Sequence, residues 1–350
     1  MALRRILGLL FFAGLVASMP LLHRGRVYAA PQGGYHVIRK MAVGGDGGWD
    51  YLTVDPDAKR IYLSRGTHVM VLDEEKGEVV GDIPDTKGVH GIALDKSSGK
   101  GYTSNGQANT VTVFDIANLK TSSTISVTGQ NPDSILFDAA NNRIWTFNGR
   151  TANATVIDAS SGQVAGTVAL AGKPETPVLD GKGSIFVNIE DKNSLQEIDA
   201  KTLAVKHTYP LAGCDEPSGI AMDTDHRRVF SGCGSKIIAV TNADTGKVVA
   251  TPPICEDTDA SGFDASAGLI FASCREGVLT VIHEDSPDKY SVVTNVKTEF
   301  GARTMALDPK THHVFTVTAD FKPAPAATAD NPHPRPSMVP GTFRVLEIGQ

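Results

Sequence analysis

Short apolar stretches alternate with polar turns along most of this chain, and the pattern repeats. The first copy begins at Tyr51 and reads YLTVDPDAKRIYLS, then HVMVLDEEKGEVVGDI. Alternating apolar and polar positions predict half-buried β-strands, and the Asp, Asn and Gly residues between them predict turns. Seven related copies follow one another, and each has an anchor aspartate that closes its first apolar stretch: Asp55, Asp95, Asp138, Asp180, Asp223, Asp264 and Asp308.

The spacing of the anchor aspartates predicts the architecture, because consecutive anchors lie 40 to 44 residues apart. A near-constant period of this length, with several short strands in each copy, is typical of a β-propeller whose copies are four-stranded blades. We therefore expect an all-β fold, a seven-bladed β-propeller, in one domain over residues 35–350. Blades bury their faces only against neighbouring blades, which argues against dividing the chain further.

The two ends of the repeat predict how the ring closes. YHVIRKMAV, residues 35–43, precedes Asp55 as a blade's fourth strand would, while the last copy lacks a fourth strand. We expect this N-terminal strand to complete the last blade, which would hide two open strand edges.

The first thirty residues have the features of a secretory signal peptide. Arg4 and Arg5 precede an apolar stretch over residues 6–22, and small residues near Ala29 offer a cleavage site. An uncleaved anchor is the alternative, because the polar residues 23–26 lie just before that site. Residues 1–30 are thus expected to direct the chain to the periplasm or outside the cell, and no later stretch is long or apolar enough to span a bilayer.

The charge balance argues against nucleic acid as a partner. The whole chain has a formal charge of −6, and without residues 1–30, which hold four arginines, 29 basic residues face 39 acidic ones. Such a surface repels phosphate backbones unless its basic groups cluster, and the sequence has no run of Lys or Arg. We expect a monomer that binds a small molecule or a protein.

Four cysteines occur at matching positions in two adjacent copies. Cys214 and Cys255 precede their anchors by nine residues, and Cys233 and Cys274 follow theirs by ten. Disulfides Cys214–Cys233 and Cys255–Cys274 are the simplest pairing in an oxidising compartment, with Cys233–Cys255 across the blade boundary as the alternative. A thiolate metal site would be expected to contain a CxxC motif, which the chain lacks.

The last copy contains an insertion rich in proline and alanine, DFKPAPAATADNPHPRPSMVPG, at residues 320–341. It lies between the second and third strands of the last blade. A flexible loop is one interpretation, and a cover over the central channel is the other.

Function is best sought among residues that differ from blade to blade at one structural position, because residues that recur in every blade serve its construction. Five residues before each anchor, on the innermost strand, the chain reaches the mouth of the central channel. All seven side chains there are polar and four are carboxylates: Asp50, His90, Asp133, Glu175, Ser218, Asp259 and Arg303. Neighbouring residues expected on the same face are His68, Asn105, Asn148, Glu190, Asp191, Glu216 and Asp257.

These ring residues allow three interpretations. They could form a water-filled polar funnel, or bind an organic ligand with Arg303 as an internal counter-ion for the carboxylates. They could also hold a divalent metal ion through nitrogen and oxygen ligands, for which the candidates are His90, Asp133, Glu175 and Asp259. Apart from that ion no cofactor is expected.

Common catalytic signatures are missing from the chain. It has no GxSxG elbow, HExxH motif, P-loop or GxGxxG strand-turn-helix context, and no nucleophile stands out. This favours a binding protein over an enzyme.

The repeat text resembles the YVTN β-propeller repeat family, and the chain from about residue 35 onward is similar to its exported YncE-type members. The resemblance rests on VDPDAKRIYLS, VTVFDIANLK, IDASSGQVAGTV and TNADTGKVVAT. The name-giving tetrapeptide is replaced by IYLS, GYTS, IWTF, IFVN, VFSG, IFAS and VFTV. The resemblance implies an exported seven-bladed binding scaffold with no shared catalytic residue.

The leading hypothesis is an exported propeller that binds a ligand or partner at its acidic channel mouth. A metal-assisted hydrolase or lyase, similar to the lactonases among related propellers, is the first alternative, with His90 and the ring carboxylates holding the metal. A structural protein that presents the proline-rich loop to a surface partner is the second.

Overall fold

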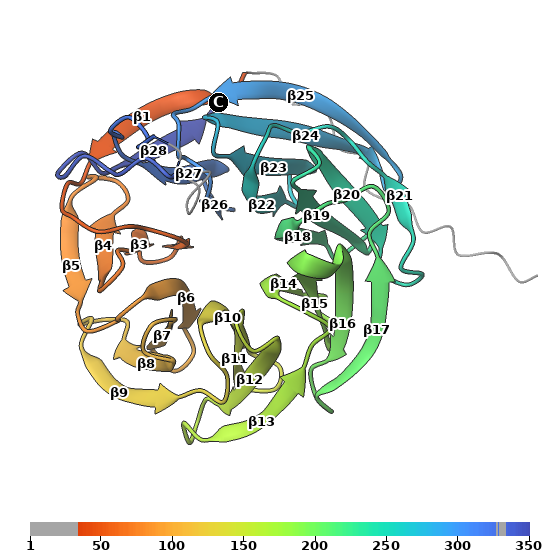
Figure 1. The fold of residues 1–350 in the computed structure, drawn as a ribbon, viewed down its shortest axis with the longest axis horizontal. Coiled ribbons are helices and arrows are strands. Elements are labelled where there is room, and N and C mark those ends of the chain that lie inside the picture. The colour runs from red at the N-terminus through yellow and green to blue at the C-terminus, as the bar shows by residue number, and fades with distance from the viewer. Residues whose placement is uncertain (1–33, 327, 329–333) are drawn as a thin grey trace, which may run out of the picture.

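A computed structural model describes residues 34–326, 328 and 334–350, and the expected signal peptide lies outside them. The described chain forms seven four-stranded antiparallel sheets. Figure 1 shows these sheets as blades around a central axis, with the chain passing from one blade to the next around the ring. The predicted all-β, seven-bladed propeller is confirmed.

The first four blades each consist of four consecutive strands. Their bounds are β2 (Leu52–Asp55), β3 (Arg60–Ser64), β4 (Val69–Asp73) and β5 (Val79–Ile83) in blade 1; β6 (Val89–Asp95), β7 (Lys100–Asn105), β8 (Thr110–Asp115) and β9 (Thr121–Ser126) in blade 2; β10 (Pro132–Asp138), β11 (Arg143–Asn148), β12 (Asn153–Asp158) and β13 (Val164–Ala169) in blade 3; β14 (Pro174–Leu179), β15 (Ser184–Ile189), β16 (Ser194–Asp199) and β17 (Ala204–Pro210) in blade 4, where the short 3-10 helix η1 (Glu190–Lys192) joins β15 to β16.

The last three blades follow the same order, except that blade 7 takes its outer strand from the start of the chain. Their bounds are β18 (Pro217–Asp223), β19 (Arg228–Cys233), β20 (Ile237–Asn242) and β21 (Val248–Ala250) in blade 5; β22 (Thr258–Asp264), β23 (Leu269–Cys274), β24 (Val278–Ser286) and β25 (Lys289–Lys297) in blade 6; β26 (Met305–Asp308), β27 (His313–Thr318), β28 (Arg344–Gly349) and β1 (His36–Ala42) in blade 7.

The ring closes through the antiparallel pair of β1 and β28. The register runs from His36 opposite Gly349 to Ala42 opposite Arg344, with one irregularity after Val37. Figure 1 shows β1 along the outside of β28, beside the C-terminus. The predicted closure, in which the first strand completes the last blade, is therefore confirmed.

Each second strand buries an aromatic residue at its third position. All seven are at most 1% exposed, and they pack in the apolar layers between blades: Tyr62, Tyr102, Trp145, Phe186, Phe230, Phe271 and Phe315. The large buried area of an aromatic ring makes this position a main source of blade cohesion. The apolar layer between blades 7 and 1, for example, joins Phe315 and Val345 to Ile61 and Leu72.

The anchor aspartates build the turns after the innermost strands. Each one accepts, through Oδ1, the amide two residues further on, as Asp55 does from Asp57 at 3.1 Å and Asp308 from Lys310 at 2.7 Å. Aspartates at the ends of the third strands do the same, for example Asp115 with Ala117 at 2.9 Å. The recurring aspartates thus act as turn residues.

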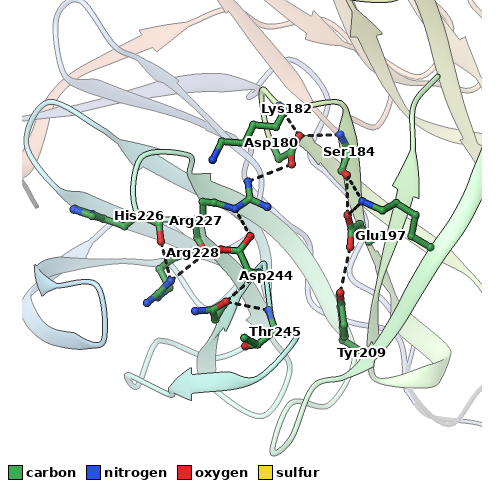
Figure 2. A network of polar contacts seen from close by, with 12 residues as sticks. Asp180, Lys182, Ser184, Glu197, Tyr209, His226, Arg227, Arg228, Asp244 and Thr245 are labelled. Carbon is green, nitrogen blue, oxygen red and sulfur yellow. Dashed lines mark hydrogen bonds and ion pairs between the residues drawn. The ribbon is translucent and has the colours of Figure 1, made fainter. Parts of the chain in front are cut away.

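Ion pairs add to the apolar contacts between blades. Figure 2 shows Arg227 of blade 5 between Asp180 of blade 4 and Asp244 of its own blade. Its Nη1 lies 3.3 Å from Asp180 Oδ2 and its Nε 2.5 Å from Asp244 Oδ1.

The two disulfides are Cys214–Cys233 and Cys255–Cys274. Each joins the segment before a blade's innermost strand to the end of that blade's second strand. The simpler of the two predicted pairings is confirmed, and the bridge across the blade boundary is excluded. None of the described helices is long and apolar enough to cross a membrane.

Candidate functional site at the channel mouth

The ring positions converge because each lies at the start of an innermost strand or just before it. Asp50 and Arg303 precede β2 and β26 by two residues, and the other five lie within β6, β10, β14, β18 and β22. Six of the seven border a cavity of about 390 Å³ at the channel mouth. The channel-mouth cavity is lined by Asp50, Tyr51, Asp133, Lys173, Glu175, Glu190, Glu216, Ser218, Gly234, Asp257, Thr258, Asp259, Arg275, Arg303 and Arg335.

His90 is the ring residue that does not line the cavity, but its side chain contacts two residues that do. Its Nδ1 lies 2.6 Å from Asp50 Oδ2 and 3.6 Å from Asp133 Oδ1. His90 instead borders a smaller hollow of about 360 Å³, together with Asn131 and Arg150. Burial lowers the pKa of His90, but its hydrogen bond with Asp50 and the charge of Asp133 outweigh burial, so the pKa is raised overall. His90 therefore holds a proton more readily than a free histidine does, beside two carboxylates.

Arg303 neutralises two ring carboxylates, as the sequence suggested. Its guanidinium forms an ion pair with Asp259 and lies 3.5 Å from Asp50 Oδ1. Ser218 Oγ donates to Asp259 Oδ1 at 3.1 Å. Asp50 and Asp259 are thus held by positive charge within the protein.

Lys173 is a cation of the site that the ring pattern did not reveal. Its Nζ lies 2.8 Å from Glu175 Oε1 and also forms an ion pair with Glu190. Burial lowers the pKa of Lys173, and the charges of Glu175 and Glu190 more than offset that effect. Glu190, predicted as a neighbour of the ring, therefore belongs to the cavity through this lysine.

Asp133 is the ring carboxylate with the least compensation. Its Oδ1 is inaccessible to solvent and has no hydrogen-bond partner among the described residues. Burial raises the pKa of Asp133 to about 6, with His90 acting against it and Asp50 adding to it. Burial and the Asp133 charge likewise raise the pKa of Glu175 to about 7. The two neighbouring carboxyl groups compete to stay ionised, and a bound cation would relieve both.

Tyr51 lines the cavity beside these carboxyl groups. Burial, followed by the charges of Asp133 and Glu175, raises its pKa well above the ordinary value. The phenol is therefore neutral at physiological pH, and its aromatic ring adds an apolar surface to a cavity otherwise dominated by charged groups.

The structure places the remaining predicted neighbours in two groups. Glu190, Glu216 and Asp257 line the cavity. Four others do not line the cavity. Asn105 and Asn148 are buried within their blades and bond nearby threonines, the His68 Nε2 lies 3.6 Å from Asp82 Oδ1, and Asp191 Oδ1 accepts the amide of Lys173 at 2.7 Å.

The insertion at residues 320–341 reaches the cavity through Arg335. Its two ends pair as a short ribbon, since Lys322 N donates to Ser337 O and Val339 N to Asp320 O, at 2.8 and 2.7 Å. Trp49, next to ring residue Asp50, packs against this base at 5.9 Å between the ring centroids of Trp49 and Phe321. The base of the insertion is therefore part of the channel-mouth surface.

The atoms that could ligate a metal are those of Asp50, His90 and Asp133, which all lie within 4.8 Å of one another. Their nitrogen and oxygen donors suit a divalent transition metal. The predicted metal set overlaps this group in His90 and Asp133. Asp259 pairs with Arg303 and Glu175 with Lys173, so neither carboxylate is as available to a metal.

Six lining residues were missed by sequence reasoning, and three of them are cations: Lys173, Arg275 and Arg335, with Tyr51, Gly234 and Thr258. One signal could have found Lys173. Seven residues before the anchors, the chain has Lys173, Glu216 and Asp257 in blades 4 to 6, and all three line the cavity. In blades 4 to 6, a second position, one residue before the innermost strand, therefore also faces the channel mouth.

Comparisons with known proteins identify the fold and stop there. No family model and no curated protein sequence matched the chain. Among solved structures, a chain of Kuenenia stuttgartiensis hydrazine synthase matches with a TM-score of 0.69 at 15% sequence identity, over 77% of this chain and 92% of that one. Since 1780 solved chains match, the likeness describes a widespread fold and carries no activity with it.

Proposed function

We propose that this protein is an exported binding protein that takes a small, positively charged ligand at the channel-mouth cavity. The carrying observation is the Asp133 carboxylate, whose buried Oδ1 has no hydrogen-bond partner among the described residues. Asp133 lines the cavity, so an ammonium or guanidinium group bound there would donate to its other oxygen and offset a negative charge that His90 compensates only from 3.6 Å.

The remaining charges of the cavity support a cationic ligand. Seven carboxylates line it, against four basic side chains: Asp50, Asp133, Glu175, Glu190, Glu216, Asp257 and Asp259, against Lys173, Arg275, Arg303 and Arg335. The basic groups are largely committed, since Arg275 pairs with Asp257 at 2.8 Å and Arg303 and Lys173 pair as described. An acidic excess in a cavity of about 390 Å³ favours a small cation over an anion.

Export is supported by the two disulfides, which persist in oxidising compartments. Membership of the YVTN-repeat propellers is supported by the repeat text and the seven-bladed ring. Both belong to the same proposal, of a periplasmic or secreted scaffold that presents its channel mouth to a diffusing ligand.

The test is calorimetric titration with 1,4-diaminobutane, and with 1,4-butanediol as the neutral analogue of the same length. We expect the diamine to bind and the diol not to. Asp133→Asn should weaken diamine binding about tenfold, the loss of roughly one charge-assisted hydrogen bond. Glu216→Gln is the comparison variant and should weaken binding less, because Glu216 lies exposed at the same cavity and makes no ion pair among the described residues.

Two results would overturn this proposal. One is equal binding of the diol and the diamine, since charge would then play no part. The other is unchanged diamine binding in Asp133→Asn, which would place any cation elsewhere on the protein.

The grouping of Asp50, His90 and Asp133 supports a second candidate, a metal-assisted hydrolase or lyase. Elemental analysis of protein purified without chelator, beside a His90→Ala/Asp133→Ala variant, separates the two functions. One equivalent of metal that is lost in the variant would favour the enzyme. A wild type without metal at this site would leave the binding protein.

A further inference from the structure

A second cluster of metal-type ligands lies away from the channel mouth, between blades 5 and 6. It consists of Asp223, the anchor of blade 5, His226 in the turn that follows, and Glu284 on β24 of blade 6. His226 Nδ1 lies 2.6 Å from Asp223 Oδ2 and 3.2 Å from Glu284 Oε1. All three ligand atoms fall within 4.8 Å of one another.

Glu284 is the unusual member, because it is 1% exposed and neither carboxylate oxygen has a hydrogen-bond partner among the described residues. A buried carboxylate in that state needs a proton or a cation. Arg228 is nearby, but its guanidinium is committed to Asp288 at 2.8 Å and to the carbonyl of Pro287. Figure 2 shows His226 and Arg228 side by side, with Arg228 donating to the His226 carbonyl rather than to its ring.

The fold does not require a glutamate here. In six blades, one residue near the end of the third strand donates its amide to a carbonyl in the turn after the innermost strand. These residues are Glu74, Ile116, Ala159, Ala200, Ala243 and Glu284. Four of the six are apolar. A buried carboxylate is therefore an addition to the blade, and its cost calls for a compensating group.

Glu74 lies against Asp308 as Glu284 lies against Asp223, so each glutamate could share a proton with its neighbouring aspartate, but the two aspartates differ. Beside Glu74, the Oδ2 of Asp308 lacks a donor among the described residues, so one proton between the two carboxyl groups satisfies both. Beside Glu284, both oxygens of Asp223 already accept: Oδ1 from the amides of Asp225 and His226, and Oδ2 from the His226 ring. A proton on Glu284 would therefore be shared with an Asp223 oxygen that already accepts a hydrogen bond, whereas a proton on Glu74 meets an Asp308 oxygen that has no other donor among the described residues.

We propose that Asp223, His226 and Glu284 form a divalent metal site between blades 5 and 6. The ligands are one imidazole nitrogen and two carboxylate oxygens, a set suited to Zn²⁺ with water completing the coordination. Neighbouring ligands of such an ion lie about 3 Å apart, close to the separations found here. The amides that hold Asp223 Oδ1 orient its other oxygen toward the ion.

The ion would replace the proton that His226 Nδ1 shares with the carboxylates. The negative charges of Asp223 and Glu284 would then face the two positive charges of the ion, and the imidazole would keep its proton on Nε2. The His226 side chain is 10% exposed, which leaves a path for the ion and its water from solvent. All four cysteines are in disulfides, so thiolates do not compete for Zn²⁺.

The test is calorimetric titration of the chelator-treated protein with ZnCl₂, with proton release measured in two buffers. We expect wild type to bind one equivalent of Zn²⁺. The affinity of Glu284→Gln for this equivalent should be at least about tenfold lower. Glu74→Gln is the matched control, because Glu74 occupies the same place at another blade interface and belongs to no cluster of metal-type ligands among the described residues. Asp133→Asn separates this equivalent from any Zn²⁺ at the channel mouth.

His226→Asn is a second variant that preserves the turn. Asn141 occupies the corresponding place in blade 3, where its Nδ2 donates to Asp138 Oδ2 at 2.7 Å. This variant should fold, keep its thermal stability without metal, and lose the same equivalent of Zn²⁺. The proposal is overturned if Zn²⁺ does not bind, if Glu284→Gln and His226→Asn bind it as wild type does, or if Asp133→Asn alone abolishes binding.

Discussion

Arg303 sets the charge available at the channel mouth, because one guanidinium contacts both Asp50 and Asp259. Each of these carboxylates would otherwise be open to a cationic ligand. The ion pairs of Arg303 therefore lower the affinity of the site for a cation, whereas Asp133 raises it. The two residues occupy the same position in their blades but have opposite effects on affinity.

Replacing Arg303 with Gln should raise the affinity for 1,4-diaminobutane several-fold, opposite in sign to Asp133→Asn. The reason is that two carboxylates lose their counter-ion and attract the ligand more strongly. The calorimetric titration checks it. Arg275→Gln, which frees only the exposed Asp257, should change the affinity less, and a fall in affinity in Arg303→Gln would contradict the charge argument.

Glu74 gives the blade interface a pH dependence. Burial, followed by the charge of and hydrogen bond with Asp308, raises its pKa from 4.5 to about 7, with Lys59 acting against them. A raised pKa in the folded state stabilises the protein fully below pH 4.5, and this contribution is lost as the pH rises through 7. Glu74→Gln should remove the dependence.

Urea denaturation of wild type and Glu74→Gln at pH 5 and pH 8 measures this effect. From pH 5 to pH 8, we expect the free energy of unfolding of wild type to fall by on the order of 1–2 kcal/mol relative to that of Glu74→Gln. This range is already reduced for solvent screening. Parallel changes in both proteins would show that Glu74 does not titrate in this range.

At the scale of strands and turns, the sequence predicted most of the fold. Period-two alternation located the strands, and the anchor aspartates located the turns, because both signals are local. The position five residues before each anchor was also located from sequence, because the same number of residues separates it from the anchor in every blade. Lys173 was missed because only one offset from each anchor was considered, and Arg335 because it lies in an insertion that the repeat does not describe. Glu284 was missed because its burial beside Asp223 is visible only in the structure.

Each disulfide should contribute roughly 3 kcal/mol, because each closes a loop with a separation of 19 residues in the unfolded chain. We expect Cys214→Ala/Cys233→Ala and Cys255→Ala/Cys274→Ala to lower the free energy of unfolding by similar amounts. Denaturation with and without reductant measures it. Wild type under reductant should lose about the sum, and a much larger loss from one pair would point to a role beyond loop closure.

At the scale of the whole molecule, β1 decides whether the ring is closed. It supplies blade 7 with its outer strand and covers an edge of β28 that would otherwise be open. The apolar layer between blades 7 and 1 also includes Met41 of this strand, so closure adds packing as well as hydrogen bonds.

A chain that begins at Gly44 should therefore be less stable and self-associate through the exposed β28 edge. Size-exclusion chromatography with light scattering would detect the association. Adding a synthetic peptide of residues 34–44 should restore the monomer, while the same residues in scrambled order should not. A stable monomer without the peptide would show that β1 is dispensable for closure.

The β1–β28 pairing also determines how the protein responds to mechanical force. His36 at the start of β1 lies opposite Gly349 at the end of β28, so both ends of the described domain leave from the same end of one antiparallel pair. Tension applied between residues 34 and 350 would load the hydrogen bonds between β1 and β28 one after another rather than all together. The closing strand would detach at low force while the other six blades remain folded.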